Sequence, residues 1–292
     1  MSHVQTTQVR EGSDFLAAAR EGRNGAGRWA LGVLIVVVFW MVIGSIPAGV
    51  SLLDGRQSGD EQYLTTNASF VAMLVGLWLA VRYVHRRPFG TLVAPDAQLR
   101  WAQALRGALY WTACVVIASV VEWVVARPEY TYSLEPGRFL PLLPVVLVLT
   151  TIQASSEEFL FRGYLLQGTG LLTRRPVVLT AVNGLLFAVP HLGNPEIGSG
   201  FALLATYYFL FGAFATLVTL RAGSLHLVIG LHVANNLMGA LVVGPPNSAL
   251  TTNKILAVPL DPLWNLIGFG IAAGLFWLMA FARPAGTTAR RI

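Results

Sequence analysis

The stretch Ser155–Gly163, SSEEFLFRG, places two adjacent glutamates and an arginine inside a long apolar segment. A charged side chain at the centre of a bilayer costs at least about 2.5–3.5 kcal/mol on insertion scales. Ionisable residues in such a position therefore indicate a functional site, unless a partner offsets their charge. The meaning of this stretch depends on whether the surrounding chain spans a membrane.

The composition is typical of a membrane protein. The 292 residues are 55% hydrophobic and only 12% charged, whereas a soluble domain carries about 25% charged residues. So many apolar residues exclude an intrinsically disordered chain. The single cysteine, Cys114, excludes a disulfide framework and a zinc site built on cysteines.

Eight apolar segments are candidates for membrane spans. A span needs about 20 apolar residues, and it must be helical because lipid offers no partner for unpaired backbone groups. We therefore predict an all-α, polytopic membrane protein with about eight transmembrane helices and a buried polar site. The expected spans are residues 29–50, 66–84, 102–126, 139–166, 176–190, 201–220, 224–243 and 263–281.

The spans define one membrane domain, residues 29–282, whose motif-bearing core is 139–243. Residues 1–28 are expected to form a mobile cytoplasmic tail, with a short amphipathic helix around residues 15–20 as the alternative. The apolar run that follows is too long for a signal-peptide core, so we interpret it as an uncleaved anchor. Residues 86–100 are expected to be a connecting loop, and residues 283–292 a cytoplasmic C-terminal tail.

The basic residues support this topology. With the N-terminus inside and eight alternating spans, 16 basic residues fall on the inner side and 4 on the outer side. Cytoplasmic loops carry such an excess of Lys and Arg. The net charge of +6 thus reflects topology and not a nucleic-acid partner. We predict an integral protein, in a bacterial plasma membrane by its composition, with both termini in the cytoplasm and the lipid bilayer as a partner.

Glu158 and Arg162 are four residues apart, so they share one face of a helix and can form an ion pair. A purely structural ion pair and a functional role are equally good interpretations of these two residues. Glu157 lies about 100° from Glu158 around the helix axis and five residues before Arg162. It is therefore poorly placed to join the Glu158–Arg162 ion pair. It must find another partner, be protonated or face water, which makes it the better candidate for chemistry.

His191 is a candidate partner of Glu157. It follows Pro190, and the apolar run 176–190 spans only about 22 Å at about 1.5 Å per residue. A helix that ends inside the membrane implies a cavity or water. Glu157 lies 17 residues before Arg174 and His191 lies 16 after Arg175, so a tight helical hairpin brings both to the same depth.

The next-to-last span contributes His232 and Asn236, which are four residues apart and face the same way. Both lie within a turn or two of the depth of Glu157, and Gln153 lies one turn before Glu157. A lone intramembrane histidine is often only a helix–helix contact. A glutamate, two histidines and an asparagine from three spans at one depth instead indicate a shared site.

These residues resemble the motifs of the CPBP family, which comprises CAAX proteases and bacteriocin-processing or immunity proteins and is also called Abi. Residues 157–162, EEFLFR, resemble its EExxxR motif, residues 187–191, FAVPH, its FxxxH motif, and residues 232–236, HVANN, its HxxxN/D motif. The three motifs stand in the family order and cover about 80 residues.

The resemblance implies an intramembrane endopeptidase of the type II CAAX prenyl endopeptidase kind. It implies that Glu157 activates the attacking water, that His191 assists, and that His232 and Asn236 stabilise the oxyanion. Glu158 and Arg162 would hold the site together. In a bacterium, a peptide or a membrane protein is a better expected substrate than a prenylated CAAX protein.

The residues themselves suit peptide hydrolysis, which needs an activated water and donors for the developing oxyanion. An HExxH zinc motif is absent. Two histidines and a glutamate also match a catalytic zinc set, so Glu157, His191 and His232 are candidate ligands of a divalent metal. If Glu157 were a ligand, the base would have to be Glu158. We therefore favour a metal-free mechanism and keep zinc as the alternative.

Two other classes of function are compatible with the sequence. A proton-coupled transporter also uses intramembrane carboxylates and histidines, but it predicts a polar pathway through the whole membrane and often repeated halves. A non-catalytic membrane scaffold or bacteriocin-immunity protein would keep the fold around an unused site. Loss of proteolysis on replacing Glu157 separates the enzyme from both.

Overall fold

The structure is a computed structural model that describes residues 15–55, 59–249 and 252–282. The expected C-terminal tail and residues 1–14 lie outside the described residues. The elements are η1 (Ala18–Glu21), α2 (Ala26–Val37), η2 (Val38–Ile43), α3 (Ile46–Leu53), α4 (Gly59–Leu79), η3 (Ala80–Val84), η4 (Phe89–Leu92), α5 (Trp101–Val125), β1 (Thr131–Tyr132), α6 (Pro136–Glu158), η5 (Phe159–Leu165), α7 (Leu166–Leu172), α8 (Pro176–His191), η6 (Pro195–Ser199), α9 (Phe201–Ala222), α10 (His226–Leu237), η7 (Met238–Val242), β2 (Val243–Gly244), β3 (Leu256–Ala257) and α11 (Pro262–Phe281).

Apolar helices make up most of the described chain, as the hydropathy predicts. Among the described residues, six helices are long and apolar enough to cross a membrane: Ala26–Leu53, Gly59–Val84, Trp101–Val125, Pro136–Leu172, Phe201–Ala222 and Pro262–Phe281. The other two expected spans, Pro176–His191 and His226–Val242, are shorter apolar helices. The predicted all-α membrane fold is confirmed, while two of the eight expected spans fall short of this length.

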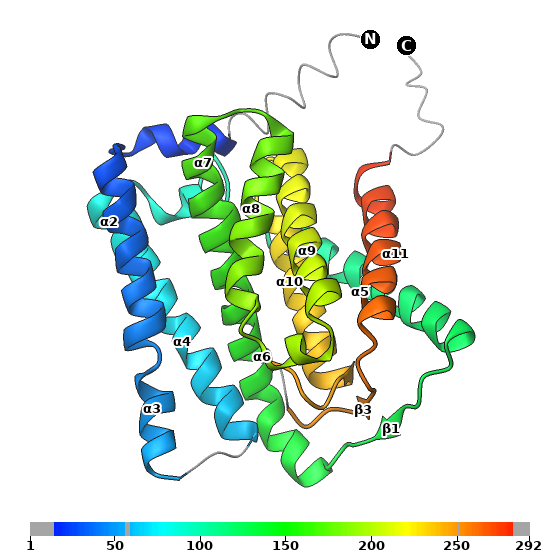
Figure 1. The fold of residues 1–292 in the computed structure, drawn as a ribbon. Helices are drawn as coiled ribbons and strands as arrows, with labels where there is room; N and C mark the ends of the chain where they lie inside the picture. Colours follow the sequence, from blue (N-terminus) through cyan, green and yellow to red (C-terminus); the bar gives the residue numbers. More distant parts are fainter. Residues whose placement is uncertain (1–14, 56–58, 250–251, 283–292) are drawn as a thin grey trace, which may run out of the picture.

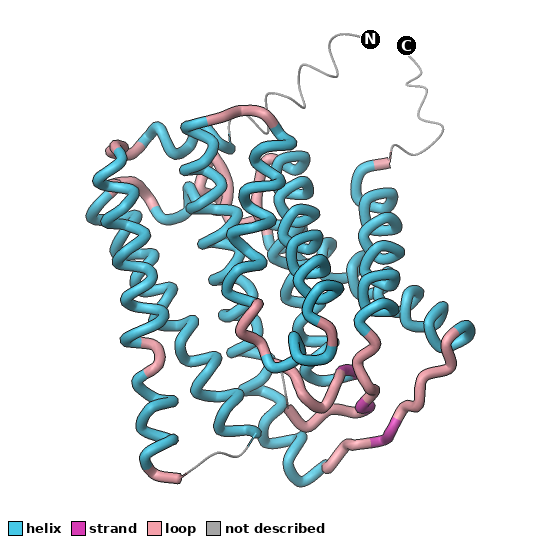
Figure 2. Tube along the Cα trace, in the orientation of Figure 1, coloured by secondary structure: helices cyan, strands magenta, loops and turns pink. Residues whose placement is uncertain are grey.

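The helices run between two ends of the molecule, which we call the terminal face and the sheet face (Figure 1). The start of α2, the turn between α7 and α8 and the end of α11 lie at the terminal face, at the top of the view. At the sheet face, β1 and β2 flank β3, antiparallel and parallel respectively. Figure 2 shows these short strands within the loops that join the helices.

Four of the helices continue into π-helical segments. The segment that matters for the site is η5, a π-helix that begins directly after Glu158 and joins α6 to α7. A π turn adds a residue to the helical repeat and re-aims the side chains that follow it, and such turns are frequent at functional sites. Together α6, η5 and α7 form the 37-residue helix Pro136–Leu172, longer than the expected span at both ends.

The segment expected to be a mobile tail packs against the protein from residue 15 onwards. Phe15 and Leu16 are buried, and η1 contacts both α7 and η4. A Cβ atom on Gly170 would lie 2.9 Å from a Leu16 methyl carbon, so α7 accommodates this side chain only because residue 170 is glycine. The arrangement follows the alternative of a short helix whose apolar residues face inwards.

The connection between residues 86 and 100 is also more ordered than the loop that we expected. It contains η4, and Leu92 and Val93 are buried. The Arg87 guanidinium donates to Gln167 Oε1 at 2.6 Å, and Gln167 donates to the Thr91 carbonyl at 2.8 Å. Burial lowers the pKa of Arg87 to about 10. This connection therefore forms a packed layer at the terminal face.

Helix α10 carries two of the candidate site residues and packs most extensively on α5. The crossing is close because glycines lie on both helices. A Cβ atom on Gly230 would lie 1.8 Å from the Ala104 carbonyl oxygen, and one on Gly107 would lie 2.2 Å from the Leu227 carbonyl oxygen. Small residues permit such approach of membrane helices.

The Gly230→Ala variant is expected to be destabilised by about 1–3 kcal/mol, because overpacking forces the backbones of α5 and α10 apart. Thermal unfolding in detergent measures the effect. Gly270→Ala on α11 is the matched control, since a Cβ atom there meets nothing within 4 Å. Equal midpoints for the two variants would contradict the close crossing.

Candidate active site

The sequence-predicted residues meet in one pocket between α4, α6, α8, α9 and α10. The pocket has a volume of about 1170 Å³, including its open mouth. Glu157, His191, His232 and Asn236 all line it. Glu158 and Arg162 are fully buried directly behind this wall. Other lining residues include Trp40, Thr66, Asn67, Phe70, Gln153, Phe187, Asn194, Glu196, Leu204, Tyr207, Tyr208, Phe211, Asn235, Pro245, Ser248, Ala249, Leu260 and Asn265.

Glu157 has one oxygen engaged and one free. Its Oε1 accepts a hydrogen bond from Gln153 Nε2 at 2.5 Å, as its position one turn away suggests. Its Oε2 is buried without a hydrogen-bond partner. This atom lies 3.8 Å from His191 Nε2 and 3.7 Å from His232 Nε2. Three polar atoms that surround a gap of this size are suitable partners for a water molecule.

The contacts of His191 define which ring nitrogen carries its proton. Nδ1 lies 2.7 Å from the Phe187 carbonyl oxygen, four residues earlier in α8. A carbonyl only accepts, so Nδ1 is the donor. In the neutral ring, Nε2 is then an acceptor that faces the free oxygen of Glu157. The end of α8 thus fixes both the orientation and the tautomer of this imidazole.

His232 is oriented by Glu158, a role that the sequence did not reveal. Its Nδ1 lies 2.6 Å from Glu158 Oε1, the same oxygen that accepts from Arg162 at 2.7 Å. The predicted Glu158–Arg162 pair is therefore present, and its carboxylate also accepts a hydrogen bond from the imidazole Nδ1–H. Because Nδ1 holds that proton, an N–H at Nε2 requires the imidazolium form.

Asn236 is tied to Glu157 through a shared glutamine. Asn236 Nδ2 donates to Gln153 Oε1 at 2.9 Å, and Gln153 in turn donates to Glu157. The glutamine therefore fixes the amide and the carboxylate relative to each other. The second N–H of the Asn236 amide is not used in this bond and remains a donor for a bound group.

Arg162 has no water-exposed surface, and three features of the interior hold it. Besides its bond to Glu158, it donates to the Gly212 carbonyl at 3.3 Å. The guanidinium carbon also lies 4.2 Å from the centroid of the Phe187 ring, which is within the range of a cation–π contact. Arg162 therefore links α6 to α9 and, through Phe187, to the helix that carries His191.

Sequence reasoning missed a second carboxylate beside the pocket, Glu196 in η6. Its Oε1 accepts from the Tyr208 hydroxyl at 2.5 Å and from Asn194 Nδ2 at 3.1 Å. Its Oε2 accepts from the Ala249 backbone N–H at 2.9 Å. The Tyr208 ring lies 4.6 Å from the His191 ring. The available signal was an acidic residue in the loop immediately after a site histidine.

The Tyr208→Phe variant is expected to lose about 2–10-fold in peptide hydrolysis. It removes two hydrogen bonds of the hydroxyl, one donated to Glu196 and one accepted from Asn194, each worth about 0.5–1.5 kcal/mol, and keeps the ring against His191. Tyr208→Leu removes the ring contact as well and is expected to lose more. Comparison of kcat/KM for the two variants separates these roles, and an equal loss would show that the ring does not position His191.

The alternative of a zinc site finds no support in the side-chain geometry. Within residues 15–55, 59–249 and 252–282, no group of three His, Cys, Asp or Glu side chains is arranged to hold a metal ion. The foreseen ligands are Glu157, His191 and His232. Of the two adjacent carboxylates, Glu158 already contacts Arg162 and His232 through Oε1 and does not line the pocket.

Fold and pocket together define a helical membrane protein with a buried acid–imidazole–amide site. Residues 139–238 match the family described as type II CAAX prenyl endopeptidase Rce1-like. The chain is also 34% identical over 209 residues to the uncharacterized protein YyaK of Bacillus subtilis (strain 168), an overlap of 70% of each chain. This chain belongs to the Rce1-like family. No solved structure matches it.

Proposed function

We propose that the protein is an intramembrane endopeptidase in which Glu157 activates water to cleave a peptide bond of a peptide or membrane-associated substrate. Family membership supports a CAAX-type membrane protease in general terms. The observation that carries the mechanism is the buried, unpartnered Oε2 of Glu157, which faces Nε2 of both His191 and His232.

The first step is attack by water. A water held between Glu157 Oε2 and the imidazoles gives one proton to Glu157, while its second hydrogen is held by His191 Nε2. The oxygen forms a bond to the carbonyl carbon of the scissile peptide. The carbonyl oxygen becomes an oxyanion, which the free Asn236 N–H and the Nε2–H of cationic His232 stabilise.

The second step breaks the peptide bond. Glu157 returns its proton to the leaving nitrogen, the C–N bond breaks, and a carboxylic acid and an amine are released. Water supplies the new oxygen, so no oxidant, reductant or covalent enzyme intermediate is needed. The reaction uses only groups that line one pocket.

The charges of the site balance in this scheme. Two carboxylates, Glu157 and Glu158, face the guanidinium of Arg162 and the imidazolium of His232. Their sum is zero, which reduces the cost of placing four ionised groups in a membrane interior. The arrangement accounts for the order EExxxR, because the second glutamate contacts both Arg162 and His232 while the first keeps an oxygen for water.

Cleavage of a peptide library by the detergent-purified protein tests the proposal. Mass spectrometry identifies the products, and hydrolysis in water enriched in oxygen-18 places one heavy oxygen in the new carboxyl group. Cleavage that is present in the wild type and absent in a matched Glu157→Gln preparation supports a peptidase. Identical behaviour of the two preparations would favour the scaffold or the transporter.

Treatment with a strong chelator is expected to leave the rate of cleavage unchanged. In the proposed mechanism Glu157 is the base, and Glu158 is already bonded to two cations. The rate before and after chelation, with zinc added back, is the measurement. Loss of activity that zinc restores would replace this mechanism by one in which Glu157 is a ligand.

A further inference from the structure

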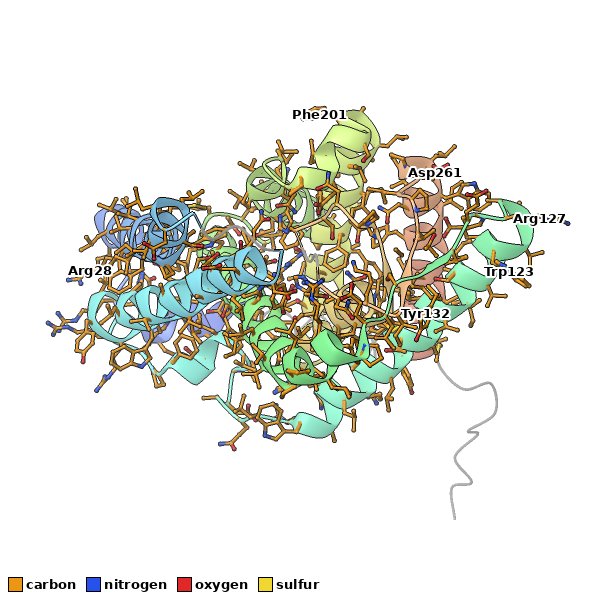
Figure 3. All side chains as sticks on the ribbon, turned by 90° about the horizontal axis from the view of Figure 1, so that it is seen from below. Arg28, Trp123, Arg127, Tyr132, Phe201 and Asp261 are labelled. Carbon is orange, nitrogen blue, oxygen red and sulfur yellow. The ribbon has the colours of Figure 1, made fainter. Side chains whose placement is uncertain are left out.

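Segments of the sheet face border the pocket of the candidate active site. Its rim comes from the segment after α8, with Asn194 and Glu196, and from the loop after η7, with Ser248 and Ala249. The Glu196–Ala249 hydrogen bond joins these two segments. Figure 3 views the molecule from this face, with Phe201 and Asp261 marking where α9 and α11 begin.

The opposite end of the pocket is closed by packed side chains. Beyond Glu158 and Arg162, the helix continues towards the terminal face with Tyr164, which is fully buried and bonded to His85 Nε2 at 2.8 Å. Leu92 and Leu225 are also fully buried there. None of these six residues lines the pocket. The pocket is therefore bordered by segments of the sheet face and closed towards the terminal face.

Basic residues identify the side of the membrane that each face occupies. The described segments at the terminal face carry Arg20, Arg23, Arg28, Arg82, Arg86, Arg87, Arg100, Arg106, Arg174, Arg175 and Arg221, whereas those at the sheet face carry Arg127, Arg138 and Lys254. Because Lys and Arg concentrate in cytoplasmic segments, the terminal face is cytoplasmic and the sheet face is non-cytoplasmic.

The few basic residues of the sheet face are largely neutralised or buried. Arg138 pairs with Asp60 at 2.9 Å and lies 3.6 Å from Glu135. Lys254 is 3% exposed and donates to the Pro245 carbonyl at 3.0 Å, and burial lowers its pKa to about 8.

From these observations we infer that the site opens to the non-cytoplasmic side of the membrane and cleaves apolar polypeptide segments exposed there. The inference rests on the proposed function for the cleavage and on the pocket and the charges for the direction. Aromatic rings of Trp40, Phe70 and Phe211 line the pocket together with the amides of Asn67 and Asn235. Such walls suit an extended peptide with apolar side chains and a hydrogen-bonding backbone.

Single cysteines in a Cys114→Ala background test the direction without requiring catalysis. Asn247→Cys is on the exposed loop at the sheet face, Gln98→Cys is exposed at the terminal face, and Asn235→Cys lines the pocket. A charged, membrane-impermeant thiol reagent is added to intact bacterial cells that express the full chain, and to inside-out vesicles prepared from them.

In intact cells we expect modification at positions 247 and 235 and protection at position 98, with position 98 reacting in inside-out vesicles. Modification of position 98 in intact cells, with protection of position 247, would invert the orientation and overturn the inference. Modification of position 247 with position 235 protected from that side would also overturn it, because the pocket would then not open there.

A second arm uses an impermeant peptide that the purified wild type cleaves. We expect cleavage at least tenfold faster in right-side-out than in inside-out vesicles, and the reverse ratio would contradict the inference. The same segment fused to a membrane helix, with its free end on the non-cytoplasmic side, distinguishes tethered from free substrates. If no peptide is cleaved in any preparation, the proposed function fails, whereas the labelling pattern still decides where the pocket opens.

Discussion

The Glu157→Gln variant is expected to lower kcat for peptide hydrolysis by about 10²–10⁴-fold, the usual contribution of a positioned general base. Glutamine has nearly the same shape and can keep the contact with Gln153, so the fold and KM should change little. Only the ability to take a proton from water is lost. Steady-state kinetics on the purified protein measure kcat and KM separately.

Glu122→Gln is the matched control for this variant. Glu122 is also a carboxylate within an apolar helix, but it lines a separate pocket between α5 and α11 with Ser119 and Trp264. Its replacement is expected to leave kcat within about twofold, since it touches none of the proposed reacting groups. Retained activity in Glu157→Gln, or an equal loss in Glu122→Gln, would remove Glu157 from the role of base.

The Glu158→Ala variant is expected to have the largest effect on stability. Both members of the Glu158–Arg162 pair have no exposed side-chain surface, and removal of one partner from a buried ion pair costs about 3–5 kcal/mol. The loss arises chiefly from the arginine, which remains charged in an apolar environment. Unfolding in detergent, followed by the change in midpoint, measures the effect.

A double-mutant cycle isolates the pair. Arg162→Met alone leaves the contact between Glu158 and His232 in place, and the double variant Glu158→Ala with Arg162→Met removes both charges. We expect the double variant to be more stable than the sum of the single effects predicts, by about 0.5–3 kcal/mol or more. Strictly additive effects would show that the two side chains do not stabilise each other.

The rate of peptide hydrolysis distinguishes the role of Glu158 from that of Arg162, which stability measurements alone cannot do. Arg162→Met keeps the carboxylate that orients His232, whereas Glu158→Ala removes it. At equal folded fraction, we expect the Glu158 variant to hydrolyse peptide more slowly than the Arg162 variant. The opposite order would remove Glu158 as the positioning partner of His232.

Helical periodicity and depth along the chain were sufficient to predict much of the site. The four-residue spacing predicted the Glu158–Arg162 contact, which the structure shows at 2.7 Å. The equal distances of Glu157 and His191 from the Arg174–Arg175 turn predicted their proximity. Both arguments need only the rise and repeat of a helix, and they hold because the continuous helix Pro136–Leu172 is followed directly by α8.

Contacts across non-adjacent segments could not be predicted in this way. The Glu158–His232 bond joins residues 74 positions apart, and the Glu196–Ala249 bond joins residues 53 positions apart. Their existence depends on how helices cross and on how loops cover the pocket. No local pattern in the sequence fixes either, which is why Glu196 and Tyr208 were overlooked.

The predicted helix ends and the predicted N-terminal segment differ from the structure for a similar reason. Hydropathy identified every apolar helix but not its ends, because π turns and internal prolines lengthen or shift a span without changing its composition. The segment before residue 28 is polar on average, yet Phe15 and Leu16 are buried. Two apolar residues suffice to anchor a short helix when a glycine such as Gly170 leaves room for them.

The central claim is that one free oxygen of Glu157 and the donors of His232 and Asn236 act on the same carbonyl group. An experimental structure with a bound peptidyl phosphinate, which mimics the tetrahedral intermediate, tests it most directly. We expect one phosphinate oxygen within about 3 Å of Glu157 and the other within about 3 Å of Asn236 or His232. A phosphinate bound with neither oxygen near Glu157 would contradict the account.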